Sequence, residues 1–138
     1  MATTIEKLKT LLARDREIEI SVMGRKSGKK ISRPVWFVLD EEKLCLLPVR
    51  GSETQWYQNL LHNRWISLST RSAAGEFNGT PITDSKRVSS VVEKFRQKYG
   101  AGDVKKYYSK LDVAVVVNLA TGKSVGIIDS SRHTPKNN

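Results

Sequence analysis

The chain has few of the residues that hold metals or form disulfides. Among 138 residues there are one cysteine, Cys45, and two histidines, His62 and His133. A single cysteine excludes an intramolecular disulfide and any multi-cysteine metal site. The two histidines lie far apart in the sequence and match no zinc-binding spacing. Cys45 alternates with Leu44 and Leu46 on an apolar segment, so we expect it to be a buried, small hydrophobic residue.

Acidic residues and long apolar runs are also scarce. The chain has 14 Asp and Glu against 24 Lys and Arg, which gives a net charge of +10 at neutral pH. A surface this basic attracts anions, such as nucleic acid, an anionic membrane or a phosphorylated ligand. No run of about 18 apolar residues is present, so we expect no membrane-spanning helix. Residues 1–16 are amphipathic rather than continuously apolar like a signal peptide, so we expect a cytoplasmic protein.

Alternating patterns predict antiparallel β structure. Alternation over 17–23 and 31–39 predicts two strands, which the glycine-flanked turn 24–30 would join as an antiparallel hairpin. Further strands are expected over 43–48, 65–70, 76–82, 113–119 and 124–128. The parallel strand–helix–strand alternation of a Rossmann domain is absent. The pattern therefore predicts an antiparallel barrel or an α+β sheet of six to seven strands with flanking helices.

Capping signals predict two helices before the middle of the chain. A capping box and an apolar face indicate an N-terminal helix within residues 1–14. Ser52 and Gln55 form a second capping box, which would open a short helix. No linker divides the chain, so we expect one domain over residues 1–129 and a disordered polar tail over 130–138.

The clearest helix signal lies in the second half of the chain. Asp84 is a predicted N-cap, and Gly100 is expected to end the helix. Helical spacing predicts that the buried residues are Val88, Val91, Val92 and Phe95, and that the exposed ones are Lys86, Lys94 and Gln97. One or two further turns of helix are expected after Asp103.

The densest chemical signal is the turn between the first two strands. Five of the ten residues from 24 to 33 are basic and none is acidic. Phosphate binds to cations, to hydroxyls and to backbone N–H groups that glycine leaves accessible. The turn is therefore a candidate phosphate site. The alternative is a solvated basic turn without a ligand, and the residues alone leave both interpretations open.

A second candidate anion site precedes the short helix. Arg50, Gly51 and Ser52 lead into Trp56 and Tyr57. A helix N-terminus preceded by Arg and Ser can bind an anion through its free N–H groups. The simpler alternative is that Ser52 only caps the helix and Trp56 packs in the core.

Tyr107 and Tyr108 are adjacent in the last predicted helix. Neighbouring residues on a helix point about 100° apart, so one apolar face cannot take both side chains. We therefore expect one tyrosine to pack inward and the other to be exposed or to line a cleft.

Several segments, taken in order, resemble a known family. The opening of the deazaflavin-dependent nitroreductases is similar to residues 22–29, VMGRKSGK, followed by residues 33–38, RPVWFV. The resemblance continues through LPVRG at 47–51 and WYQNL at 56–60, and it covers residues 17–119. It implies a split β-barrel, which these proteins share with pyridoxamine-phosphate oxidases and other FMN-binding oxidoreductases.

The same resemblance implies a set of site residues. The residues that match cofactor-binding positions are Arg25, Lys26, Ser27, Arg33, Arg50, Gly51, Ser52 and Trp56. The first four match the positions that hold the phosphate and acidic tail of the deazaflavin coenzyme F420, and the others match the loop and helix beside the cofactor. Tyr107 and Tyr108 fall where the family places substrate-lining tyrosines, so they are the candidate catalytic residues.

The leading hypothesis is an F420- or FMN-dependent oxidoreductase. It would transfer hydride from the reduced cofactor to an electrophilic acceptor, such as a quinone, a nitroaromatic or an activated alkene. One alternative is a non-catalytic split-barrel protein that binds a flavin or another phosphate-bearing ligand. A nucleic-acid-binding domain is disfavoured, because the basic residues cluster in one hairpin instead of alternating with aromatics along a sheet. Split barrels commonly dimerise, so we expect a homodimer.

Overall fold

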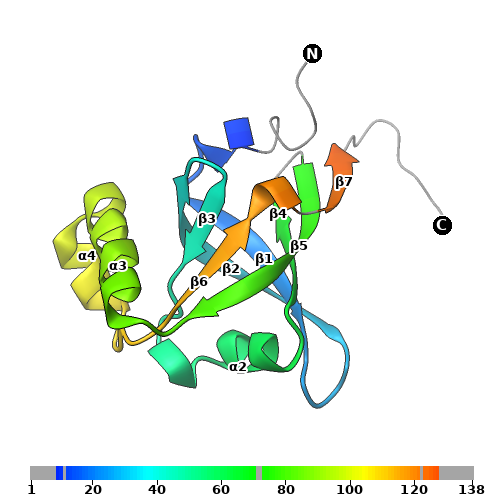
Figure 1. Ribbon diagram of the computed structural model, residues 1–138, viewed down its shortest axis with the longest axis horizontal. Helices are drawn as coiled ribbons and strands as arrows, with labels where there is room; N and C mark the ends of the chain where they lie inside the picture. The colour runs from blue at the N-terminus through cyan, green and yellow to red at the C-terminus, as the bar shows by residue number, and fades with distance from the viewer. Residues whose placement is uncertain (1–8, 11, 71–72, 122, 128–138) are drawn as a thin grey trace.

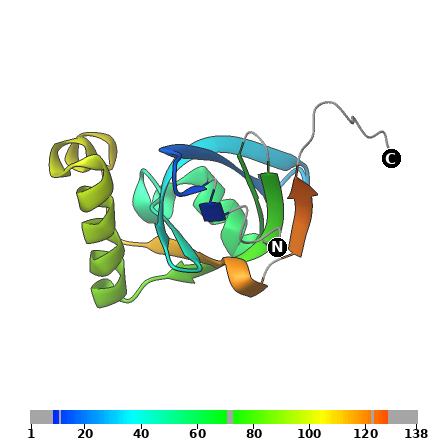
Figure 2. The same ribbon diagram turned by 90° about the horizontal axis from the view of Figure 1, so that it is seen from above.

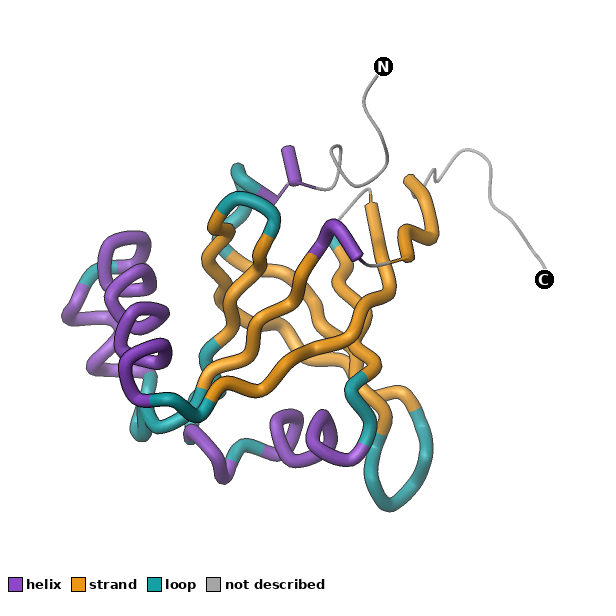
Figure 3. The backbone as a smooth tube through the Cα atoms, in the orientation of Figure 1, coloured by secondary structure: helices purple, strands orange, loops and turns teal. Residues whose placement is uncertain are grey.

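The strands of this protein close into a barrel. The structure, a computed structural model, describes residues 9–10, 12–70, 73–121 and 123–127. Its strands are β1 Glu17–Met23, β2 Lys30–Asp40, β3 Lys43–Leu46, β4 Trp65–Ser69, β5 Ala73–Ile82, β6 Ala114–Asn118 and β7 Lys123–Ile127. Neighbours pair antiparallel in the order β4-β1-β2-β3-β6-β5, and pairing of β4 with β5 closes the ring (Figure 1; Figure 3). β7 pairs with β5. The predicted α+β split barrel is confirmed.

β1 and β2 form the predicted antiparallel hairpin, and Met23 pairs with Lys30 at its closed end. Across the turn, the N–H of Gly24 donates to the carbonyl of Lys29 at 2.7 Å. Gly28 has a φ of 71°, in the left-handed region that glycine adopts without steric cost. The glycines therefore allow a tight turn in which the intervening basic residues project from the barrel.

Helices cover one end and one side of the barrel. α2 (Gln55–His62) lies across the lower end of the barrel in Figure 1 and behind the ring of strands in Figure 2. α3 (Ser85–Tyr99) and α4 (Ala101–Tyr107) lie together against one outer side (Figure 2). As predicted, the carboxylate of Asp84 caps α3, accepting from the N–H of Arg87 at 3.0 Å, and Gly100 ends the helix with a φ of 97°.

Two long strands, β2 and β5, run through both halves of the barrel. β2 pairs with β1 as far as Trp36 and with β3 from Phe37 onward. β5 pairs with β4 as far as Asn78 and with β6 from Gly79 onward. A Cβ on Gly79 would lie 3.1 Å from the side chain of Leu60, so glycine here lets α2 lie close to the barrel.

Two apolar clusters form the core. The barrel interior holds fully buried side chains that include Phe37, Leu44, Leu60, Ile66 and Leu68. A second cluster, between α3 and the outer face of the barrel, contains the four predicted residues Val88, Val91, Val92 and Phe95. Cys45 belongs to it, and burial raises the pKa of its thiol, as expected for a structural cysteine.

The outward residues of α3 agree with the prediction at two of three positions. Lys86 and Gln97 are exposed. Lys94 is only partly exposed, which corrects the prediction, because its ammonium lies 3.7 Å from the carboxylate of Asp40 at the end of β2. The ion pair holds the aliphatic part of the Lys94 side chain against the surface of the barrel, which partly covers it.

The Ser52 capping-box prediction is wrong. α2 begins at Gln55 after Thr54, and Gly51–Glu53 forms a separate 3-10 turn. The hydroxyl of Ser52 donates to the carboxylate of Asp112 at 2.7 Å instead. A charged acceptor from a distant part of the chain competes successfully with a local cap, because charge-assisted hydrogen bonds are the stronger ones.

The ends of the chain are only partly described. Lys9, Thr10 and Leu12 are helical, and Leu12 is fully buried in the barrel core. The rest of the predicted helix within 1–14 consists of a turn and of residues outside the described part, and the predicted tail over 130–138 also lies outside it. Within the described ranges, no helix combines the length and apolarity needed to cross a membrane.

The hydroxyl of Tyr99 connects α3 to β2. It accepts the N–H of Phe37 at 3.0 Å and lies 2.8 Å and 2.6 Å from the carbonyl oxygens of Phe37 and Arg16. Burial raises the pKa of Tyr99 to about 12, so the hydroxyl keeps the proton that it donates.

We expect Tyr99→Phe to lower the free energy of unfolding by about 1–3 kcal/mol, because the buried N–H of Phe37 would lose its acceptor. Urea denaturation followed by circular dichroism measures this. Tyr107→Phe is the matched control, because that side chain is 49% exposed and its change should stay within about 0.5 kcal/mol. Equal, small effects of the two variants would show that the hydroxyl of Tyr99 adds no net stability.

Candidate functional site

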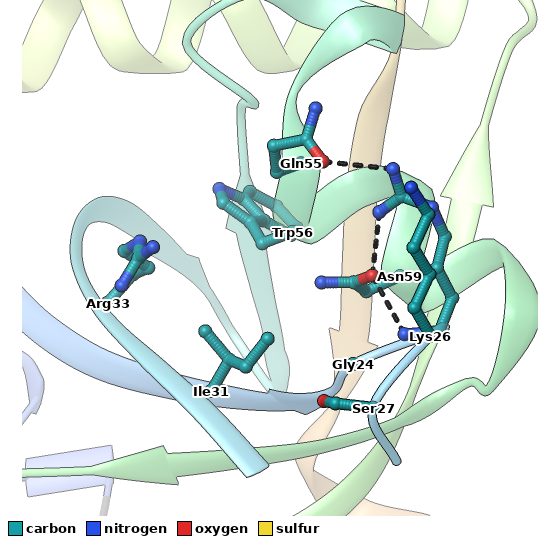
Figure 4. A pocket seen from close by; sticks show the side chains of 9 residues that line it. Gly24, Lys26, Ser27, Ile31, Arg33, Gln55, Trp56 and Asn59 are labelled. Atoms are coloured by element: carbon teal, nitrogen blue, oxygen red, sulfur yellow. Dashed lines mark hydrogen bonds between the residues drawn. The ribbon is translucent and has the colours of Figure 1, made fainter. Parts of the chain in front are cut away.

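A basic pocket of about 290 Å³ lies between the β1–β2 hairpin and α2. The hairpin contributes Gly24, Arg25, Lys26, Ser27, Ile31 and Arg33, and α2 contributes Gln55, Trp56 and Asn59. Three of these nine residues are cationic and none is acidic. In Figure 4, Arg33 and Trp56 face the same open space, with Ile31 beneath them. The fold thus adds one face of α2 to the predicted basic turn.

Arg25 connects the turn to α2. Its Nη1 donates to Oδ1 of Asn59 at 2.7 Å, and its Nη2 donates to Oε1 of Gln55 at 2.9 Å. Its backbone N–H also donates to Oδ1 of Asn59, at 3.1 Å. Three hydrogen bonds therefore hold the turn against the helix. The guanidinium has five N–H donors, so some of them stay available to a ligand.

Lys26 and Arg33 are the less constrained cations of the basic pocket. Both are exposed, and neither makes an ion pair with a carboxylate in the part of the chain that the structure describes. Within the described residues, the guanidinium of Arg33 donates only to the carbonyl of its neighbour Ser32, at 3.1 Å. Ser27 accepts the N–H of Lys29 and can still donate its own hydroxyl hydrogen. This donor set suits an anion with several oxygens, such as phosphate.

The second predicted anion site does not join the basic pocket. The N–H of Gly51 donates to the carbonyl of Pro48 at 3.0 Å, and the N–H of Ser52 donates to Asp112 at 2.9 Å. Arg50 lies in the same loop, outside the residues that line the basic pocket. The carboxylate of Asp112 thus takes the place that a bound anion would need. The chain supplies its own anion at this loop, and cofactor contact by Arg50, Gly51 and Ser52 stays a prediction.

An aromatic pocket of about 370 Å³ lies where α4 meets the outer face of β2. Its lining residues are Glu17, Pro34, Val35, Trp36, Leu47, Val49, Asp103, Tyr107 and Tyr108. The indole of Trp36 stacks on Tyr99 with ring centroids 4.2 Å apart, and it meets Tyr107 edge-on at 5.6 Å. Most of the lining surface is therefore apolar and aromatic, which suits a planar organic molecule.

The two adjacent tyrosines take opposite environments, as predicted, but not within one helix: α4 ends at Tyr107, and Tyr108 is its C-cap with extended backbone. Tyr108 is 6% exposed and packs against Trp36 and Phe95, whereas Tyr107 is 49% exposed at the mouth of the aromatic pocket. Burial raises the pKa of Tyr108. Its hydroxyl donates to no group within the described ranges. Tyr107 is thus the tyrosine whose hydroxyl a molecule in the pocket can reach.

Neighbouring residues of one strand line both pockets. Ile31 and Arg33 of β2 line the basic pocket, and Pro34, Val35 and Trp36 line the aromatic pocket. Strand residues rise by about 3.3 Å each, so Arg33 and Trp36 are separated by roughly 10 Å along β2. Successive side chains of a strand point to opposite faces, so Arg33 and Trp36 project from opposite faces of β2, and their separation along the strand does not by itself let one ligand contact both pockets.

The sequence matches the model of the F420H2-dependent quinone reductases over residues 5–120. This chain belongs to that family. The match includes the whole β1–β2 hairpin, α2 and α4, and therefore every residue that lines the two pockets. Among curated protein sequences, none matches the chain significantly.

Solved structures resemble this family member in fold. The F420-H2 dependent reductase FDR-A is 17% identical, with a TM-score of 0.53, over 74% of this chain and 93% of that one. A structure described as an F420 reductase is 17% identical, with a TM-score of 0.55, over 86% and 94% of the two chains. HutZ, a heme storage protein from Vibrio cholerae, is 11% identical, with a TM-score of 0.64, over 86% and 87%. At these identities the likeness shows the fold alone.

Sequence reasoning missed three residues of the basic pocket, Ile31, Gln55 and Asn59. Asn59 carried a usable signal, because it lies three residues after Trp56 and so on the same face of the helix. A polar residue on a buried face needs hydrogen-bond partners. Which partners they are depends on the position of the hairpin, and that follows only from the closure of the barrel.

Proposed function

We propose that this member of the F420H2-dependent quinone reductase family binds reduced F420 with its phosphate in the basic pocket, and reduces an electrophilic acceptor in the aromatic pocket. The acceptor would be a quinone, a nitroaromatic or an activated alkene. The observation that carries the proposal is a pocket with three cationic residues and no carboxylate, in a chain of this family. FMN has a similar phosphate and a shorter tail, so it is the second candidate cofactor.

The residues of the basic pocket fit a phosphate. Lys26, Arg33 and the hydroxyl of Ser27 can donate to it without giving up an ion pair within the described part of the chain. A Cβ on Gly24 would lie only 2.7 Å from the oxygen of Ser27, so glycine allows the close turn that brings these donors together. Trp56 offers an apolar surface beside them.

When bound, the reduced deazaflavin supplies the hydride. The chain itself would hold the phosphate, orient the reactants and limit the access of water. Trp36, Pro34 and Val49 line the apolar side of the acceptor site. The hydroxyl of Tyr107 would give a proton to the acceptor oxygen and regain one from solvent, so the acceptor gains a hydride and a proton.

The direct test is titration of the purified protein with F420 and, separately, with FMN, followed by difference absorbance and by turnover with a quinone. Saturable spectral change with F420 and consumption of its reduced form would support the proposal. Binding without turnover of any acceptor would favour a non-catalytic binding protein. Binding to nucleic acid without a spectral change would contradict the proposal. That the protein acts as a homodimer in the cytoplasm stays a prediction.

Tyr107→Phe is expected to lower kcat with a quinone by about two- to fivefold. A well-positioned general acid contributes about 10²–10⁴-fold, but water reaches the exposed Tyr107 and can replace it in part. Tyr108→Phe is the matched variant and should change kcat less, because the ring is buried and faces the core. If both variants keep the wild-type kcat with every acceptor tried, the proton comes from water and neither tyrosine is catalytic.

A further inference from the structure

Asn59 is a buried polar side chain in the basic pocket. It is 4% exposed, and the described part of the chain has one other buried polar residue, Ser21. Its Oδ1 accepts two hydrogen bonds from Arg25, one from the backbone N–H at 3.1 Å and one from Nη1 at 2.7 Å. Half of the amide is therefore fully engaged in holding the turn.

These two hydrogen bonds fix the orientation of the Asn59 amide. The backbone N–H and the guanidinium of Arg25 are both donors only, so the group that faces them must be the oxygen. Turning the amide over would set donors against donors. The NH₂ group consequently faces the other way, and Figure 4 shows the nitrogen of Asn59 directed toward the space between Ile31 and Trp56. It donates to no group in the described residues.

A buried NH₂ group directed into a pocket requires an acceptor there. Of the side chains that line the pocket, Lys26 and Arg33 cannot accept a hydrogen bond, and the oxygens of Ser27 and Gln55 already accept from Lys29 and Arg25. A phosphoryl oxygen accepts and does not donate, and it would satisfy all of these groups together. An ammonium group only donates, so it would meet further donors, and a neutral hydroxyl would leave the two cations without a counter-charge.

We propose that Nδ2 of Asn59 donates to a phosphoryl oxygen of the ligand in the basic pocket, and that Arg25 is a positioning residue that holds the amide in this orientation. This inference rests on the proposed function, because it names a recognition contact of the same site. It divides the cationic turn into two roles. Arg25 orients Asn59, whereas Lys26 and Arg33 supply the charge that the phosphate meets.

Asn59→Asp tests the NH₂ group of Asn59 separately from its oxygen. The carboxylate keeps an oxygen toward Arg25 and adds an ion pair, so the melting temperature should equal or exceed that of the wild type. The second oxygen replaces the NH₂ group and would repel a phosphate. We expect the affinity for F420, measured by equilibrium titration, to fall at least about tenfold.

Asn63→Asp is the matched control. Asn63, the C-cap of α2, receives the same change of amide to carboxylate, but it is exposed and does not line the basic pocket. We expect its effect on F420 affinity to be less than about threefold, because solvent screens the new charge. Equal losses from the two variants would mean that net charge alone weakens binding, and would overturn the assigned contact.

A second readout does not depend on F420. In nitrogen-15 NMR spectra, the side-chain NH₂ signals of Asn59 are identified by their absence from Asn59→Asp. Titration with inorganic phosphate should shift them in the wild type. If phosphate shifts the backbone amide signals of the β1–β2 turn but not the side-chain NH₂ signals of Asn59, the inference is overturned. If phosphate shifts the NH₂ signals but F420 does not bind, the inferred contact stands and the proposed cofactor is wrong.

Discussion

Phe95→Ala is expected to lower the free energy of unfolding by about 3–5 kcal/mol, the range measured when a large aromatic residue is removed from a packed core. Phe95 is fully buried in the middle of α3. Its ring lies 5.7 Å from that of Tyr99 and 5.9 Å from that of Tyr108, centroid to centroid. The surrounding rings are anchored to different elements, so they cannot all move inward to fill the cavity.

Urea denaturation followed by circular dichroism measures the loss. Gln97→Ala is the matched control, because it lies on the exposed face of the same helix and should change stability by less than about 0.5 kcal/mol. Phe95→Leu retains most of the volume and should cost clearly less than Phe95→Ala. A loss below about 1 kcal/mol for Phe95→Ala would mean that α3 is not tightly packed on the barrel.

The position of Phe95 also links stability to the aromatic pocket. Tyr99 stacks on Trp36, and Tyr108 packs beside the same indole, so the rings that surround Phe95 also support one side of that pocket. Loss of the Phe95 ring should therefore change the near-ultraviolet circular dichroism of Trp36 along with the stability.

Local patterns predicted the elements whose contacts are close in sequence. The β1–β2 hairpin follows from alternation and turn glycines, and α3 follows from spacing and its Asp84 cap. The pairing of β4 with β5 and of β3 with β6 does not follow from such patterns, because many strand orders satisfy the same alternation. The choice between a barrel and an open sheet therefore came from the family resemblance.

The candidate site shows the same division. The basic turn was visible in composition, but its contact with α2 through Asn59 depends on the closed barrel. The cap at Ser52 was predicted wrongly because Asp112 is brought to it from elsewhere in the fold. For Tyr107 and Tyr108, helical geometry predicted one inward and one outward side chain. Only the packing of Tyr108 against Trp36 and Phe95 decides which is which.

Arg33→Ala is expected to weaken the binding of F420 by about 10- to 100-fold. A hydrogen bond to a charged group contributes about 1.5–3 kcal/mol, and each 1.4 kcal/mol corresponds to a tenfold change in Kd. Arg33 lines the basic pocket, and the one side-chain hydrogen bond that it makes within the described residues goes to the carbonyl of Ser32. Its guanidinium can therefore turn toward a phosphate without breaking an ion pair within the described residues.

Lys30→Ala is the control that decides between a built phosphate site and a merely basic hairpin. Lys30 lies on the same strand, is exposed and carries the same charge, but it does not line the basic pocket. Its contribution to binding is long-range attraction, which about 0.15 M salt screens over roughly 8 Å, so we expect less than a threefold change in Kd. Neither variant should change the free energy of unfolding by more than about 0.5 kcal/mol, since both side chains are exposed. If the two variants weaken F420 binding equally and slightly, the turn acts only as a solvated positive surface, and the phosphate must be held elsewhere on the protein.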